Sequence, residues 1–140
     1  IDSLMKVVGS EDDMNGQKQF VGELFSIAKD LQIHVHLIHH IRKPLNEAAI
    51  PDKYDLKGSG SISDQVDNIF TVWRNKGKED DIRNAGKFGN KSGEHDGVLK
   101  CCKQRHYEGS GDGEPAIGLW LHKDSAQFLG SAGDQPAIYE

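Results

Sequence analysis

The sequence predicts an α/β fold with a mostly parallel sheet, helices packed on it and an antiparallel hairpin at the C-terminal end. Short runs of branched apolar residues alternate with helix signals along the first hundred residues. Two further runs of the same kind then follow with only a glycine-rich connection between them. Strands that alternate with helices form parallel sheets, whereas adjacent strands joined by a turn form hairpins.

The composition places the chain among globular proteins of one domain. It has 140 residues, which suffice to bury a core. The two cysteines are adjacent in the sequence, so on a strand they point to opposite faces and suggest neither a disulfide nor a zinc site. No apolar run approaches the roughly 20 residues that cross a bilayer, and no signal peptide is present. These features favour a cytoplasmic protein that does not contact membranes.

The first elements are a strand end and a long helix. The opening "IDSLMKVVG" lacks a methionine and resembles the tail of a buried strand, which suggests a piece of a longer protein. An apolar stripe at helical spacing then predicts a helix over residues 17–31. It consists of Phe20, Leu24, Ile27, Ala28 and Leu31.

The next elements alternate in type. "IHVHLIHH" predicts a strand buried on both faces. A polar loop leads to "DLKGSGS", and "SISDQVDN" predicts a short helix because its serines suit an N-cap. "NIFTVWR" predicts a second strand, and residues 76–97 predict a long mobile loop because they lack periodicity and are rich in charge and glycine. "VLKCCKQR" and "AIGLWLHK" predict the last two strands.

The charge is distributed unevenly. The net charge is -5, yet residues 42–105 hold thirteen Lys and Arg against ten acidic residues. A solvated surface of mixed charge and a nucleic-acid interface both fit this pattern.

The histidines permit two interpretations. Strand alternation places His34, His36 and His40 on one face and His39 on the other. A His-x-His pair is a two-ligand spacing for zinc, which makes a metal hydrolase an alternative, but no third ligand is evident. Packing of His34 and His36 under a helix is the other interpretation. His40 differs because it ends the strand, where open α/β sheets bind ligands.

Three further features permit both a structural and a chemical role. Asp2 at a strand end is either a solvated turn residue or a Mg²⁺-binding aspartate of the kind found in P-loop ATPases. The glycines of "LKGSGS" form either a tight turn or a cradle for phosphates of a nucleic-acid backbone. Lys103 and Arg105 share one strand face, either as solvated edge residues or as cations for a phosphate.

Taken together, these segments resemble the C-terminal RecA-like motor of hexameric replicative DNA helicases, of the DnaB, phage primase-helicase and Twinkle type. "YDLKGSGSISDQVDNIFTVWRNK" is similar to the family's Asp-Leu-Arg-Gly-Ser-Gly segment with its helix and strand. "LIHHIRKP" is similar to the phage strand that ends in His, and "VLKCCKQRHYEGSGDG" to the Lys-x-Arg strand. The resemblance implies that residues 1–140 are the C-terminal part of a P-loop NTPase core without its Walker A half.

The resemblance also implies roles for individual residues. Asp2 corresponds to the Walker B aspartate, which holds Mg²⁺ through water, and His40 to the sensor of the ATP γ-phosphate. Arg105 corresponds to an arginine finger for the neighbouring subunit, with Lys103 beside it. Arg74 and His122 correspond to residues that flank the adenine, although His122 stands where an aromatic residue is commoner.

For single-stranded DNA, the resemblance implies contacts by loops that face a central channel. These loops correspond to Ser3, Leu4, Arg42, Lys43, Lys57, Gly58, Ser59 and Gly60. Backbone amides and cations without an aromatic platform suit contact with phosphates regardless of sequence. The implied partners are single-stranded DNA, further copies in a hexameric ring, and a primase or other replisome proteins.

Two departures limit the activity expected of this chain alone. No Gly-Lys-Ser/Thr loop and no catalytic glutamate are present, so we expect the 140 residues to hydrolyse no ATP by themselves. A RecA/KaiC-like ATPase of recombination or regulation is the alternative within the same fold. A non-catalytic nucleic-acid-binding module is a further alternative.

Overall fold

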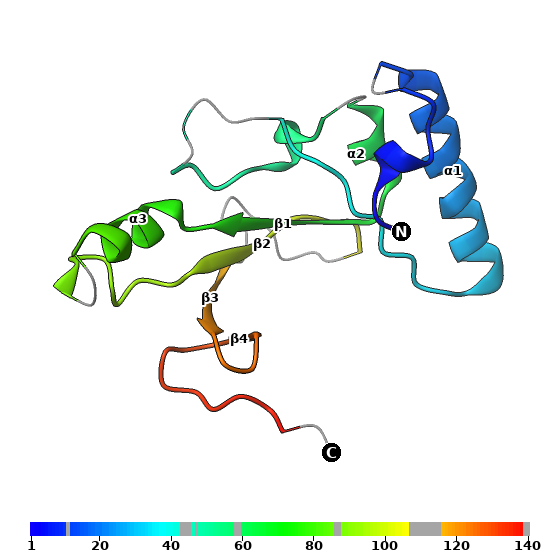
Figure 1. Ribbon diagram of the computed structural model, residues 1–140. Helices are drawn as coiled ribbons and strands as arrows, with labels where there is room; N and C mark the ends of the chain where they lie inside the picture. The colour runs from blue at the N-terminus through cyan, green and yellow to red at the C-terminus, as the bar shows by residue number, and fades with distance from the viewer. Residues whose placement is uncertain are drawn as a thin grey trace. The chain divides into compact units, whose positions relative to one another are not determined.

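A computed structural model describes residues 1–10, 12–42, 46, 48–57, 60–85, 88–106 and 116–138 (Figure 1). The chain forms two compact units. The first comprises Ile1–Pro44, Pro51–Ile69 and Lys103–Tyr107, and the second comprises Leu45–Ile50, Phe70–Cys102 and Glu108–Glu140. None of the described helices is long and apolar enough to cross a membrane.

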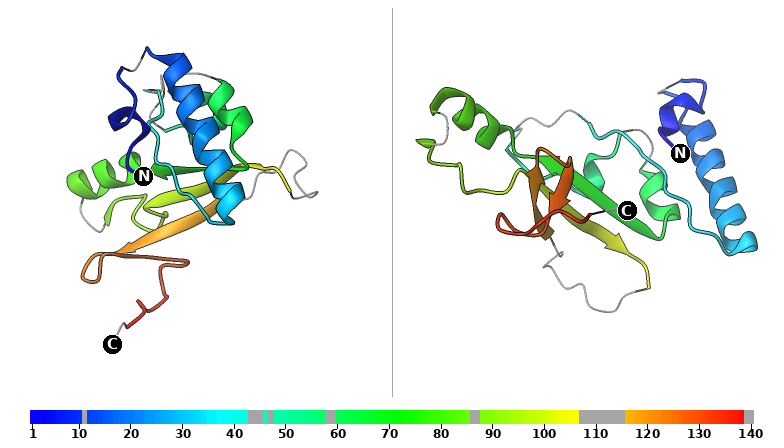
Figure 2. Two further views of the ribbon diagram at one scale, coloured as in Figure 1. Left: turned by 90° about the vertical axis from the view of Figure 1, so that its right-hand side faces the viewer. Right: turned by 60° about the horizontal axis from the view of Figure 1, so that its bottom comes forward.

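The first unit is built around helix α1 (Met14–Leu31), which packs against the short helix α2 (Ser61–Gln65) (Figures 1 and 2). Asp13 caps α1 because its carboxylate accepts a hydrogen bond from the Gly16 amide at 2.8 Å. Two 3-10 turns, η1 (Leu4–Lys6) and η2 (Lys53–Asp55), complete the unit. Its core consists of Leu4, Val21 and Ile62, with Val8, Phe20, Leu37 and Val66 packed around them.

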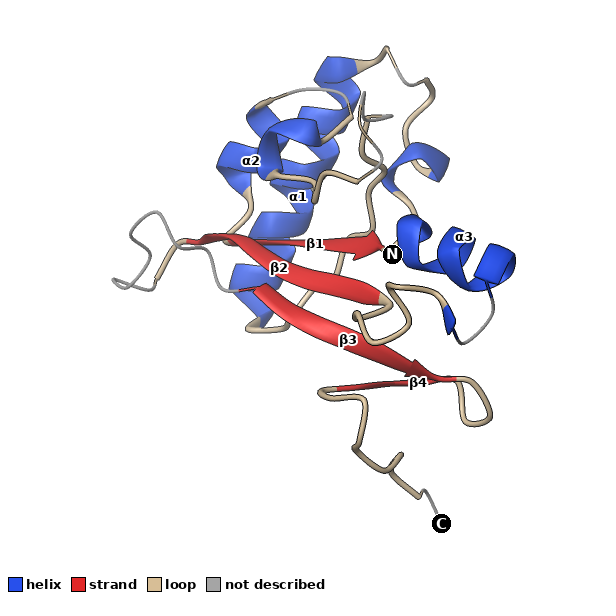
Figure 3. Ribbon diagram, turned by 90° about the vertical axis from the view of Figure 1, so that its left-hand side faces the viewer, coloured by secondary structure: helices blue, strands red, loops and turns tan. Residues whose placement is uncertain are grey.

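The sheet has four strands in the order β1-β2-β3-β4 (Figure 3). They are β1 (Asn68–Arg74), β2 (Gly97–Gln104), β3 (Ala116–His122) and β4 (Gln127–Leu129). All but the first two residues of β1 and the last two of β2 belong to the second unit. Helix α3 (Lys76–Ala85) follows β1 in the same unit.

The prediction of a mostly parallel, RecA-like sheet is wrong, because the four strands are antiparallel. The antiparallel pairing of β1 with β2 is held at both ends. The Asn75 amide donates to the Asp96 carbonyl, and the Arg105 amide donates to the Asp67 carbonyl. Within the described residues, parallel pairing occurs only as an isolated bridge between Asp2 and Ile38.

The strand predicted from "IHVHLIHH" is also wrong in its extent and burial. Residues 33–40 join no sheet strand, and Ile33 and Ile38 are about half exposed. A strand needs a partner along its length, whereas the partner segment here pairs only around Ile38. Residues 33–40 are therefore not an interior strand of a sheet.

Most of the other predicted elements are confirmed. The helix predicted over residues 17–31 is present and begins at Met14, and the strand 68–74 and the β2–β3 hairpin are also present. The predicted helix in "SISDQVDN" is confirmed but ends at Gln65. Residues 76–97, for which the sequence predicts a loop, begin with helix α3, and strand β4 has no counterpart in the prediction.

Candidate functional site

The N-terminal residues lie against the segment that contains the histidines, within the first unit. The Ile38 amide donates to the Ile1 carbonyl at 2.9 Å, and the Leu4 amide donates to the Ile38 carbonyl at 3.1 Å. The Asp2 side chain is exposed, whereas Ser3 and Leu4 are buried. Leu4 is therefore a core residue whose side chain and amide are both engaged, and only Asp2 of these three presents its side chain to solvent.

The segment after Ile38 pairs next with residues 55–57. The Lys57 amide donates to the His40 carbonyl at 3.1 Å, the Arg42 amide donates to the Asp55 carbonyl, and Ile41 bridges Leu56 antiparallel. The segment 38–42 therefore pairs through its backbone with Asp2 on one side and with residues 55–57 further along. The side chains of His40 and Arg42 are exposed, and that of Lys57 is partly exposed.

His39 holds this pairing in place, a role that strand alternation does not predict. Its Nε2 lies within hydrogen-bonding distance of the Lys57 carbonyl oxygen, so it donates there in the Nε2–H tautomer. The His39 side chain thus binds the Lys57 carbonyl, and the backbone carbonyl of the next residue, His40, accepts from the Lys57 amide. Gly60 lies at the N-cap of α2, and its carbonyl accepts from the Ser63 hydroxyl. Lys43, Gly58 and Ser59 lie outside the described residues.

Lys103 and Arg105 bind the C-terminal end of α2. The Lys103 Nζ donates to the Ser63 carbonyl at 2.6 Å, and the Arg105 guanidinium donates to the Asp64 carbonyl at 2.5 Å. Arg105 also pairs with Asp67 at 3.0 Å. Burial, followed by the nearby charge of Arg105, lowers the pKa of Lys103. Cations at a helix C-terminus satisfy its last carbonyls, so both side chains cap α2 in this conformation.

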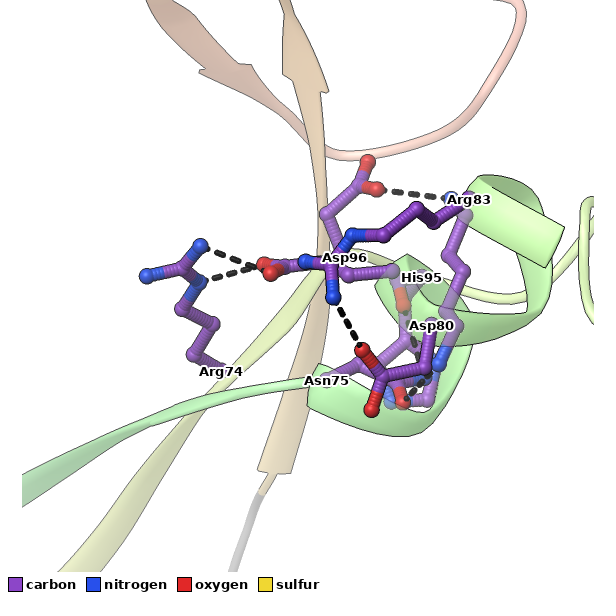
Figure 4. A network of polar contacts seen from close by, with 8 residues as sticks. Arg74, Asn75, Asp80, Arg83, His95 and Asp96 are labelled. Carbon is purple, nitrogen blue, oxygen red and sulfur yellow. Dashed lines mark hydrogen bonds and ion pairs between the residues drawn. The ribbon is translucent and has the colours of Figure 1, made fainter.

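The two predicted adenine-flanking residues do not form one site. The Arg74 guanidinium pairs with both carboxylate oxygens of Glu79, which raises the pKa of Arg74 and lowers that of Glu79 (Figure 4). The His122 Nδ1 contacts the Ser125 hydroxyl at 2.8 Å. Arg74 belongs to the exposed face of β1, whereas His122 on β3 lies on the face of Trp120.

A buried polar network in the second unit has no counterpart in the predicted sites. Lys78 is buried, with its Nζ 2.8 Å from an Asp96 oxygen and bonded to the Glu94 carbonyl. The Asn75 side chain accepts from the Lys78 amide and donates to Glu94 and to the His95 carbonyl. Figure 4 shows Asn75, His95 and Asp96 gathered at the start of α3. An Asn just before a charged segment is an N-cap signal that could have revealed α3.

A metal centre gains no support from the described part of the chain. It contains no group of three or more His, Cys, Asp or Glu side chains that could hold an ion. His34 and His36 are exposed and stacked, with ring centroids 4.4 Å apart. The single carboxylate of Asp2 would need further ligands from water, a nucleotide or another segment to hold Mg²⁺.

No family model matches the chain, and neither does any curated protein. Its own residues therefore provide the basis for inferring function. The structure brings Asp2, His40, Arg42 and Lys57 onto one surface of the first unit. It also places Lys103 and Arg105 in that unit, bound to α2.

Proposed function

We propose that the chain is part of an ATP-dependent replicative DNA helicase and that its first unit contacts single-stranded DNA. The observation that carries this proposal is the pairing of residues 38–42 with residues 55–57. It brings together Arg42 and Lys57, which belong to two of the segments that the resemblance assigns to DNA, and the His40 carbonyl accepts a hydrogen bond from the Lys57 amide. Asp2 lies on the same surface through its bridge to Ile38.

The chemistry of this surface suits contact with phosphates rather than bases. The guanidinium of Arg42 and the ammonium of Lys57 supply positive charge. Such cations bind a strand mainly by releasing its condensed counterions, so affinity falls steeply with salt and depends little on sequence. A net charge of -5 for the whole chain is compatible with this contact because the acidic excess lies outside residues 42–105.

The ATP chemistry in this proposal belongs to an assembled hexameric ring. Asp2 would hold Mg²⁺ on the nucleotide through water, and His40 would contact the γ-phosphate. Arg105, with Lys103 beside it, would reach the nucleotide of a neighbouring copy. The proposed setting is the cytoplasm of a bacterial or phage-infected cell, with a primase and other replisome proteins as partners.

Fluorescence anisotropy with a labelled thymidine oligonucleotide tests the DNA contact. We expect saturable binding at low salt, and the same affinity for a second oligonucleotide of mixed sequence. Arg42→Gln and Lys57→Gln should each weaken binding. Each should also reduce the steepness of log K against log salt by about 0.7, because each variant neutralises one phosphate fewer on the single strand.

Lys18→Gln is the matched control, because Lys18 is an exposed cation of α1 in the same unit. It should leave the salt slope unchanged. An absence of saturable binding at low salt would refute the proposed function. Equal weakening by Lys18→Gln and Arg42→Gln would show that binding follows net charge and not this surface.

A further inference from the structure

One face of the sheet in the second unit is apolar and exposed. Five large side chains make up this apolar sheet face, each between 40% and 67% exposed. They are Phe70 and Val72 on β1, Ile117 and Leu121 on β3, and Phe128 on β4.

Strand pairing shows that these residues share one face. Leu121 lies directly opposite Phe128, and residues two apart on β3 point the same way, which adds Ile117. Ile117 in turn lies opposite Leu99 of β2. On an antiparallel pair, directly opposite residues lie on the same side of the sheet.

The β1 residues join this face because their neighbours lie on the other one. The Thr71 hydroxyl contacts the Cys102 thiol at 3.4 Å, so these buried residues share a face. Cys102 is three positions from Leu99 and therefore points away from it. Phe70 and Val72 flank Thr71, so they point to the side of Leu99.

On the opposite face, one side chain from outside the strands packs against the sheet. His95 packs against Trp73 and Trp120, with ring centroids 6.3 and 6.1 Å from its own. A sheet buries its apolar faces against a second layer. Among the described residues of the second unit, the five side chains of the apolar sheet face are left exposed instead.

We infer that the apolar sheet face binds the same face of a second copy of this chain, which gives a two-fold symmetric dimer. The exposed area supports this occupant. At roughly half exposure, five side chains of about 150–200 Å² each expose on the order of 450 Å² per copy, within the roughly 300–600 Å² of the largest apolar patch on a typical monomer, a patch that is often functional. Two copies would bury about 900 Å² between them before flanking atoms are included, close to the lower limit for a specific interface.

The charges of this face also fit a second copy. Arg74 is the one charged side chain that the described strand residues of the second unit place on this side, and Glu79 neutralises it. Lys103, the next residue but one after Cys101 on the same side of β2, belongs to the first unit and binds carbonyls of α2. Two such faces can therefore meet without bringing unpaired like charges together. Packed sheets of this kind lie about 10 Å apart with their side chains interdigitated. This contact is isologous, unlike the head-to-tail contacts of a ring, so it does not depend on the proposed function.

Sedimentation velocity of the 140-residue chain from about 5 to 500 µM tests the dimer, because a small interface predicts dissociation in the micromolar range. We expect the average mass to rise from 15.5 kDa and level off at twice that value. A monomer across the whole range would overturn the inference, and so would growth beyond the dimer.

Val72→Lys and Phe128→Lys test the face from two different strands. Both side chains are exposed in the single copy, so the substitutions should leave its fold intact, which the fluorescence of Trp73 and Trp120 checks. Each should weaken association by roughly tenfold or more, because it places two ammonium groups at an apolar interface. Leu31→Lys is the matched control, since Leu31 at the end of α1 is 65% exposed and Val72 is 67% exposed. Association that survives Val72→Lys, or that Leu31→Lys weakens equally, would refute this assignment.

Discussion

The buried ion pair between Lys78 and Asp96 predicts a large loss of stability for Lys78→Met. Methionine is nearly as long as lysine but carries no charge. The Asp96 carboxylate then loses its partner at 2.8 Å, and the Glu94 carbonyl loses a donor. Removing one member of a buried pair costs about 3–5 kcal/mol.

Two features of the structure reduce this figure. The Asp96 side chain is 30% exposed, so water can hydrate part of the charge left behind. Its other oxygen keeps the hydrogen bond from the Leu121 amide at 2.8 Å. We therefore expect a loss of about 2–3 kcal/mol in the free energy of unfolding, which would lower the urea midpoint by roughly 1–2 M.

Urea denaturation followed by tryptophan fluorescence measures this loss in the relevant unit. Trp73 and Trp120 are the two tryptophans of the chain, and both lie in the second unit. Arg83→Met is the control on the same helix, because the Arg83–Asp80 pair is exposed and should contribute less than about 0.5 kcal/mol (Figure 4). A second substitution, Asp96→Asn, should restore part of the loss in Lys78→Met. Equal stability of Lys78→Met and Arg83→Met would refute the reasoning.

Three further predictions concern other contacts. Arg74 lowers the pKa of Glu79 below its ordinary 4.5. Their ion pair therefore stabilises the fold above pH 4.5, and this stabilisation is lost as the pH falls through the lowered pKa. Glu79→Gln should flatten this acid dependence of the urea midpoint. His39→Leu removes the donor to the Lys57 carbonyl and should speed amide exchange at Lys57 about fivefold, whereas His39→Gln, which can still donate, should restore much of the protection. Gln32 ends α1 in the left-handed region at φ 50°, so Gln32→Gly should stabilise the helix by about 0.5–1 kcal/mol in urea denaturation followed by circular dichroism.

Local patterns predict the elements that depend on local interactions. The apolar stripe that ends at Leu31 predicts α1, and the branched residues of 68–74 predict β1. The direction of strand pairing is a different kind of property, because it depends on contacts between residues far apart in the sequence. The hydrogen bonds that join Asn75 to Asp96 and Arg105 to Asp67 make β1 and β2 antiparallel, and no periodicity encodes them.

Helix α3 shows a second limit of pattern reading. Its sequence is charged on most sides, which favours a loop on composition alone. The Asn75 cap and the bonds of Lys78 to Asp96 and Glu94 anchor it instead. A lysine with a buried, paired ammonium is a tertiary feature, and the hydropathy of lysine predicts the opposite placement.

The candidate site was predictable where it depends on local sequence patterns. Strand ends and glycine-rich loops point to Asp2, His40 and Lys57, and the structure places them on adjoining backbone segments. Burial of Leu4 was not predictable, because it depends on packing against Val21 of α1 and Ile62 of α2. The role of His39 also depends on a distant partner, the Lys57 carbonyl.

Capping of α2 by Arg105 and the proposed finger role of Arg105 are compatible on energetic grounds. In the single copy, Arg105 donates to the Asp64 carbonyl and pairs with Asp67, and its side chain is 37% exposed. Such a half-exposed ion pair contributes about 0–1 kcal/mol and the hydrogen bond about 1–3 kcal/mol. An arginine finger accelerates phosphoryl transfer by about 10³–10⁵, which corresponds to roughly 4–7 kcal/mol in the transition state. Release of Arg105 from α2 would therefore cost less than the finger supplies in the transition state, so the capping seen in the single copy does not conflict with the proposed role.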